Sequence, residues 1–73
     1  MKVKLEGKIV DIKPNGMYVV ELSYNGKKKK IVATLGGKLR YNRITVIEGD
    51  KVVIEFEPIP GREIIGKIVY RLR

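Results

Sequence analysis

The sequence predicts an all-β domain that folds as a small closed barrel of five strands. Three observations support this fold class: alternating apolar runs recur along the chain, turn residues separate these runs, and no segment keeps a helical apolar period for several turns. The chain has 73 residues. A chain of this length buries only one core, so we expect a single domain over residues 1–73.

The first predicted strand, residues 3–13, is long and changes phase. The apolar side chains of its first half fall on the face of Leu5, whereas Val10 and Ile12 fall on the opposite face. A change of phase after Gly7 indicates a β-bulge or a sharp coil, which lets one strand serve both halves of a barrel. The other predicted strands occupy residues 17–24, 27–35, 51–57 and 64–72.

Turn residues mark the ends of these strands. Residues 14–16, Pro-Asn-Gly, favour a turn because proline fixes φ and the other two residues tolerate positive φ. Asn-Gly at residues 25–26 is the pair most typical of a two-residue hairpin. Gly-Gly at residues 36–37 ends the third strand, and residues 38–43 form a connector long enough for one helical turn at most. Two prolines favour a loop at residues 58–61.

These elements predict a five-stranded Greek-key OB-fold barrel with a short connector or one-turn helix between strands 3 and 4. An SH3-like barrel is the alternative. Tyr18 and Tyr70 share strand faces with Leu22 and Ile68, so we expect both tyrosine rings in the core. Barrel closure also removes the free edges that a flat sheet of this size exposes.

The net charge of +8 lies almost entirely in the middle of the chain. Residues 22–47 contain no acidic residue, whereas the segments before and after are nearly balanced. A basic domain has nucleic acid as its first candidate partner; an anionic membrane or an acidic protein comes second. The basic residues of the segment are Lys27, Lys28, Lys29, Lys30, Lys38, Arg40 and Arg43.

The residues that are missing exclude several function classes. The chain has no cysteine and no histidine, so it has neither thiolate ligands nor the commonest general base and metal ligand. Glu55 and Glu57 share a predicted strand face, but without a nearby nucleophile we interpret them as solvent-facing charge. No apolar run approaches the roughly 20 residues that span a bilayer, and the N-terminus lacks a signal core. We therefore expect no enzyme activity, metal, cofactor or membrane association.

The order of short motifs along the chain resembles a known family. Gly-Lys-Leu-Arg at residues 37–40 is followed by Tyr-Asn-Arg-Ile at 41–44 and Glu-Gly-Asp-Lys-Val at 48–52. Pro-Asn-Gly-Met-Tyr-Val-Val-Glu-Leu at residues 14–22 and Gly-Lys-Ile-Val-Tyr-Arg at 66–71 flank them. This ordered set covers nearly the whole chain and resembles bacterial translation initiation factor 1. Two departures are the absence of the family histidine and of one arginine from its Ile-Arg-Ile motif.

The resemblance implies a cytoplasmic, monomeric RNA-binding protein that is not an enzyme. It also implies binding to the A site of the small ribosomal subunit during initiation, with the subunit's rRNA and other translation initiation factors as partners. Arginines in the connector suit phosphates and stack on unpaired bases, Tyr41 offers a stacking face, and Asn42 can read a base edge. The candidate nucleic-acid-binding residues are Lys38, Arg40, Tyr41, Asn42, Arg43, Lys67 and Arg71, with a secondary electrostatic patch of Lys27, Lys28, Lys29, Lys30 and Arg73.

Two other functions remain open from the sequence. The first is a generic single-stranded nucleic-acid-binding OB domain, although such domains use clustered surface aromatics and this chain has only five aromatic residues. The second is an engineered or redesigned β-barrel scaffold with no retained RNA function, whose lysines confer solubility. Individual residues also have structural explanations: Asn42 as a cap of the connector, and Arg71 as the partner of a glutamate on a neighbouring strand.

Overall fold

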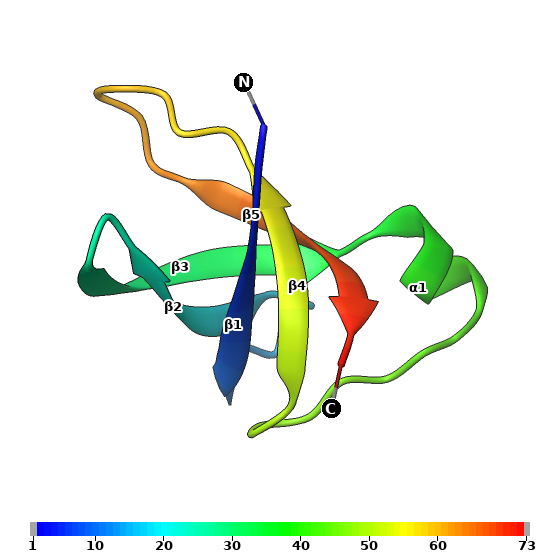
Figure 1. Cartoon of the computed structure of the whole chain (residues 1–73). Coiled ribbons are helices and arrows are strands. Elements are labelled where there is room, and N and C mark those ends of the chain that lie inside the picture. Colours follow the sequence, from blue (N-terminus) through cyan, green and yellow to red (C-terminus); the bar gives the residue numbers. More distant parts are fainter. Residues whose placement is uncertain (1, 73) are drawn as a thin grey trace.

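Five strands close into a barrel, and one short helix lies between the third and fourth strands in the computed structural model, which describes residues 2–72 (Figure 1). The spatial order is β1-β2-β3-β5-β4, and β4 returns to pair with β1. β3 and β5 are parallel, and every other neighbouring pair is antiparallel. This order confirms the predicted OB-fold barrel. The elements are β1 (Val3–Ile12), β2 (Tyr18–Tyr24), β3 (Lys27–Leu35), α1 (Gly37–Tyr41), β4 (Lys51–Phe56) and β5 (Ile65–Arg71).

β1 pairs with β4 through its first half and with β2 through its second half. Its register with β2 shifts between Ile9 and Asp11, which confirms the predicted bulge. Gly7 is buried where β1 crosses β2, and a Cβ atom there would lie 2.5 Å from Val20 Cγ1. Because only glycine fits this crossing, the strand can coil closely enough to close the barrel.

The hairpin between β2 and β3 turns at Asn25 and Gly26, which have φ values of 54° and 76°. Positive φ at both central residues defines the two-residue turn that matches the twist of paired strands. After this turn the first four residues of β3 are exposed lysines, and only from Ile31 do its side chains enter the core. The hairpin and the loop between β4 and β5 project from one side of the barrel, whereas α1 lies on the other side (Figure 1).

The core fills the barrel and extends under α1. Tyr24 packs its ring edge against Phe56 at one end, with ring centroids 5.6 Å apart. Among residues 2–72 no buried side-chain nitrogen or oxygen lacks a hydrogen-bond partner. The core consists entirely of hydrophobic side chains, namely Ile9, Val20, Leu22, Ile31, Ala33, Leu39, Val46, Val52, Ile54, Phe56 and Ile68.

The prediction that Tyr70 lies in the core is wrong. The register between β4 and β5 pairs Ile54 with Ile68 but Val53 with Tyr70, so Val69 is an extra residue in β5. This irregularity moves Tyr70 to the outer face, where it is 60% exposed. Tyr18 packs against the core as expected.

Candidate nucleic-acid interface

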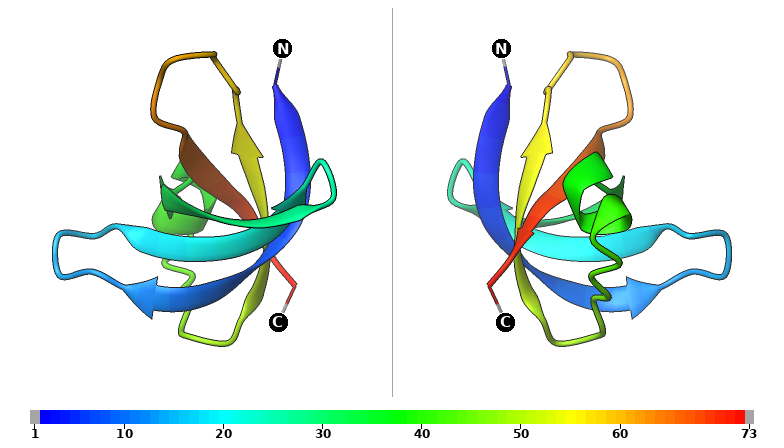
Figure 2. Two further views of the ribbon diagram at one scale, coloured as in Figure 1. Left: turned by 90° about the vertical axis from the view of Figure 1, so that its left-hand side faces the viewer. Right: turned by 90° about the vertical axis from the view of Figure 1, so that its right-hand side faces the viewer.

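The start of α1 is held against β5 by a close backbone contact. The Gly36 N–H donates to the Ile68 carbonyl oxygen at 2.8 Å. A Cβ atom on Gly36 would lie 2.7 Å from that oxygen and 3.3 Å from Lys67 Cγ, so glycine permits this approach. Leu39 then anchors the helix in the core with 5% of its surface exposed. The helix therefore has a fixed position beside β5, which the two further views show (Figure 2).

The end of α1 is a Schellman motif with an arginine at the position that usually holds glycine. Ile44 N–H donates to the Leu39 carbonyl at 2.9 Å, and Arg43 N–H donates to the Arg40 carbonyl at 3.2 Å. Arg43 has a φ of 56°, a left-handed conformation that costs about 1–2 kcal/mol for a residue with a side chain. Asn42 is the C-cap of α1, and its backbone N–H donates to the Lys38 carbonyl, so the backbone of Asn42 caps the helix as its structural explanation predicted. The motif projects Arg43 away from the barrel at a cost in stability.

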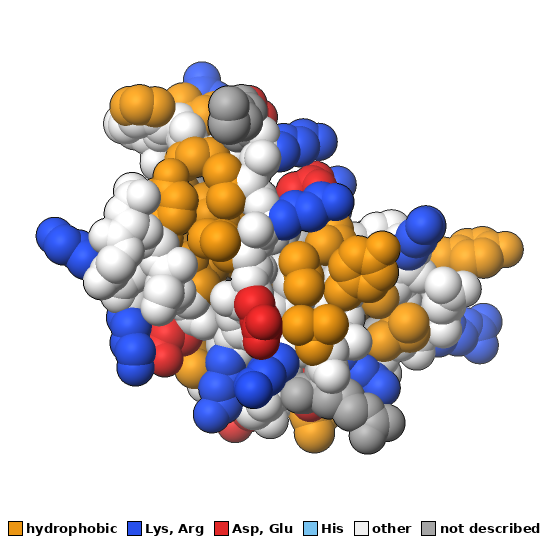
Figure 3. Space-filling model, in the orientation of Figure 1, with side chains coloured by type: hydrophobic (Ala, Val, Ile, Leu, Met, Phe, Trp, Pro, Cys, Tyr) orange, Lys and Arg blue, Asp and Glu red, His pale blue; other side chains and the backbone are white. Residues whose placement is uncertain are grey.

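The side chains that the sequence predicted for this connector belong to α1 and to the two residues that follow it. All five are exposed, and Tyr41 is 87% exposed. No acidic residue lies in the first turn of the helix. Figure 3 shows blue basic and orange hydrophobic side chains side by side at the right, where α1 lies. We call this group the α1 surface; it comprises Lys38, Arg40, Tyr41, Asn42 and Arg43.

A cavity of about 290 Å³ separates α1 from the outer face of β4 and β5. Lysines line it from three elements: Lys4 from β1, Lys38 from α1 and Lys67 from β5. Its one carboxylate, Glu55, is engaged by Lys4 at 3.9 Å and by Lys2 at 3.6 Å. Glu55 is therefore less solvent-facing than the sequence predicted, and the cavity keeps an excess of positive charge.

Tyr70 also lines this cavity, and the sequence analysis missed it as a candidate. Its ring brings an exposed aromatic surface next to Lys38 and Lys67. The sequence indicates the opposite placement, because Ile68, Tyr70 and Leu72 alternate with Val69 and Arg71, and only the pairing with β4 reveals the extra residue in β5.

The remaining predicted residues lie on two sides of the barrel: some are near α1 and the others are on the hairpin across from it. Lys67 lies beside the start of α1, in contact distance of the Gly36 position. Arg71 Nη1 donates to the Thr45 carbonyl at 2.8 Å, so it ties the segment after α1 to β5 instead of pairing with a glutamate. The lysines of the secondary patch, Lys27 to Lys30, lie on the hairpin across the barrel from α1 (Figure 1). Arg73 lies outside the described residues.

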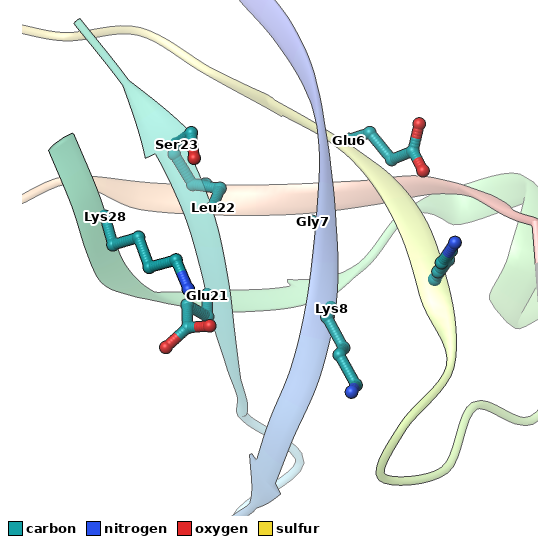
Figure 4. Close-up of a pocket in the computed structure, with 8 residues that line it drawn as sticks. Glu6, Gly7, Lys8, Glu21, Leu22, Ser23 and Lys28 are labelled. Atoms are coloured by element: carbon teal, nitrogen blue, oxygen red, sulfur yellow. The ribbon is translucent and has the colours of Figure 1, made fainter. Parts of the chain in front are cut away.

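A second cavity, of about 240 Å³, lies over β1 and β2 and carries mixed charge (Figure 4). Glu6 and Glu21 line it together with Lys8, Lys28 and Lys51. The two carboxylates offset most of the lysine charge, so this cavity favours a polyanion less than the α1 surface does. Within residues 2–72 no three acidic side chains cluster as metal ligands would. No helix in that range has the length and apolar character needed to cross a membrane.

Comparisons with known proteins place this barrel in a family. Residues 2–73 match the family translation initiation factor 1A / IF-1. The structure is similar to the solution structure of translation initiation factor IF-1 from the Wolbachia endosymbiont strain TRS of Brugia malayi, with 26% identity and a TM-score of 0.75; the match covers 99% of this chain and 79% of that chain. It is also similar to YjeQ from Thermotoga maritima, with 27% identity and a TM-score of 0.69, over 97% of this chain and 23% of that chain.

The family match spans nearly all residues, and the similar initiation factor from the Wolbachia endosymbiont has the same small barrel. The predicted family resemblance is therefore confirmed. This chain belongs to the translation initiation factor 1A / IF-1 family.

Proposed function

We propose that this protein binds the A site of the small ribosomal subunit during initiation and cooperates there with other initiation factors. Members of its family are translation initiation factors, which act with the ribosome and are not enzymes. The observation that carries the proposal is the α1 surface, where Lys38 and Arg40 on α1 and Arg43 just after it are exposed, and where the start of the helix is hydrogen-bonded to β5.

The chemistry of the α1 surface suits folded RNA. Arginine forks bind phosphate oxygens through two parallel hydrogen bonds, and lysine binds them as a point charge. Tyr41 and Tyr70 offer exposed rings on which unpaired bases can stack. The left-handed conformation of Arg43 supports a binding role, because backbone strain of this kind concentrates at functional sites.

The basic residues near α1 and those on the hairpin would then have different roles in binding RNA. Lys38, Arg40, Arg43, Lys67 and Arg71 contact RNA on the α1 side of the barrel. The hairpin lysines lie too far around the barrel to join those contacts, so they raise the long-range attraction to RNA. We infer a cytoplasmic protein that works as a monomer without metal or cofactor.

A generic single-strand binder is less well supported by the structure. Such OB domains stack bases on aromatic side chains that cover the strands. Here Tyr18 and Tyr24 pack against the core and Phe56 is buried, so the rings that face outward belong to Tyr41 and Tyr70.

Co-sedimentation with isolated small ribosomal subunits at moderate salt tests the proposal. We expect the protein to pellet with the small subunit, to remain in the supernatant with the large subunit, and to be displaced by a ligand of the A site. Equal binding to both subunits and to an unrelated polyanion would instead identify a generic electrostatic binder. Failure to bind any RNA would favour the scaffold without RNA function.

A further inference from the structure

The first half of β3 has one open edge. β3 pairs with β2 from Lys27 to Ala33, but β5 joins its other side only from Val32 onward. Within residues 2–72 no backbone hydrogen bond reaches the far edge of residues 27–30. In an antiparallel pair, alternate residues direct their N–H and C=O groups away from the partner. These groups are a template on which another strand can pair.

The loop between β4 and β5 does not close this edge. It leaves a cavity of about 270 Å³ between the end of the open edge and the segment before β5. Ile31, Val32 and Ile64 give this cavity apolar walls, and its charged lining residues are Lys29, Lys30, Arg62 and Glu63, a net positive set. A strand that paired with residues 27–30 could therefore place one apolar side chain in the cavity at its end.

Positively charged side chains on both faces of the open edge favour an acidic partner strand. All four lysines are exposed. Lys27 and Lys29 lie opposite Tyr24 and Leu22, whereas Lys28 and Lys30 lie on the other face of the sheet, opposite Ser23 and Glu21. A second copy of this edge would set lysine against lysine, which destabilises a strand pair. An acidic strand would instead meet opposite charge on both faces.

We propose that residues 27–30 accept an acidic, extended peptide segment as an added strand beside β3. The backbone edge favours a peptide over a nucleic acid, because strand addition uses main-chain hydrogen bonds for affinity. The interaction is separate from RNA binding by the α1 surface, which lies on the other side of the barrel.

The probe for this interaction is an acetylated eight-residue peptide that alternates glutamate with valine. Two further versions carry N-methyl groups on one or the other set of alternate backbone nitrogens. An added strand pairs through one edge only, so one methylated version should bind at least about tenfold more weakly and the other should bind like the parent. Parent binding should also slow hydrogen exchange of amides in residues 27–30. Similar affinity for all three peptides, protection elsewhere, or no binding would overturn the proposal.

A matched pair of variants separates edge charge from total charge. Replacing Lys27, Lys28, Lys29 and Lys30 with glutamine should weaken peptide binding at least about tenfold, because the glutamates of the alternating peptide lie on one face of the added strand and lose the two lysines that they face there. Replacing Lys2, Lys4, Lys8 and Lys13 with glutamine removes the same charge from β1 and the residues beside it, and should leave binding within about twofold. Equal losses in both variants would overturn strand addition. Lys38→Ala with Arg40→Ala should leave peptide binding unchanged, so the outcome is independent of RNA binding.

Discussion

Replacement of Gly36 with alanine tests whether the contact between α1 and β5 fixes the α1 surface. The new Cβ atom would lie 2.7 Å from the Ile68 carbonyl oxygen, where ordinary contact begins at 3.4 Å. The backbone would have to retreat by about 0.7 Å, the difference between these two distances. The hydrogen bond from Gly36 N–H to that oxygen, now 2.8 Å long, would stretch to about 3.5 Å and be largely lost.

The expected loss of stability follows from these two effects. A lost intramolecular hydrogen bond costs about 1 kcal/mol, and an overpacked contact costs about 1–3 kcal/mol. We therefore expect Gly36→Ala to lower the free energy of unfolding by about 2–4 kcal/mol. Gly37→Ala is the matched control, because no atom beyond its chain neighbours and its own helix backbone lies within 4 Å of its Cβ position. It adds a better helix former and should be neutral or stabilising by up to about 1 kcal/mol.

Urea denaturation of the two variants and the parent measures this difference. RNA binding should fall in Gly36→Ala, because Lys38 and Arg40 would move away from Lys67, and should persist in Gly37→Ala. Equal stability of the two variants would refute the close contact. Reduced stability of Gly36→Ala with unchanged RNA binding would refute its role in positioning the α1 surface.

Three further substitutions separate stability from binding. Tyr70→Ala should leave thermal stability nearly unchanged and weaken RNA binding by about 1–3 kcal/mol in a filter-binding titration. A large loss of stability would instead indicate that the Tyr70 ring packs in the core. Arg43→Gly should relieve the left-handed strain and raise stability by up to about 1 kcal/mol, while RNA affinity falls; unchanged affinity would show that Arg43 does not contact RNA. Leu39→Ala should cost about 2–5 kcal/mol in urea denaturation, and a smaller cost would mean that α1 is not anchored in the core.

Strands whose ends are marked by local turn chemistry were predictable from the sequence. The hairpin at Asn25 and Gly26 and the bulge in β1 follow from residues close together in the chain. The irregularity in β5 was not predictable, because it depends on pairing with β4 and leaves the local alternation unchanged. Tyr70 was placed on the wrong face for that reason.

The sequence grouped the exposed residues of the α1 surface, but it indicated neither the cavity beside them nor the place of Tyr70. The acid-free segment of residues 22–47 suggested one basic region. The structure divides it, because β3 crosses the barrel between Lys27 and α1 and carries the hairpin lysines to the opposite side. The approach of Lys67 to α1 depends on the parallel pairing of β3 and β5, which links residues far apart in sequence.

The most direct test of RNA binding by the α1 surface compares two double variants in co-sedimentation with small ribosomal subunits across a salt series. Lys38→Ala with Arg40→Ala should abolish pelleting at moderate salt and leave the melting temperature unchanged. In a titration with single-stranded RNA, the same double variant should have a log–log salt slope that is smaller by about 1.4, because each lost phosphate contact contributes about 0.7. Lys29→Ala with Lys30→Ala removes the same charge from the hairpin and should still pellet. Full pelleting of the first variant, or equal loss in both, would contradict the assignment of RNA binding to the α1 surface.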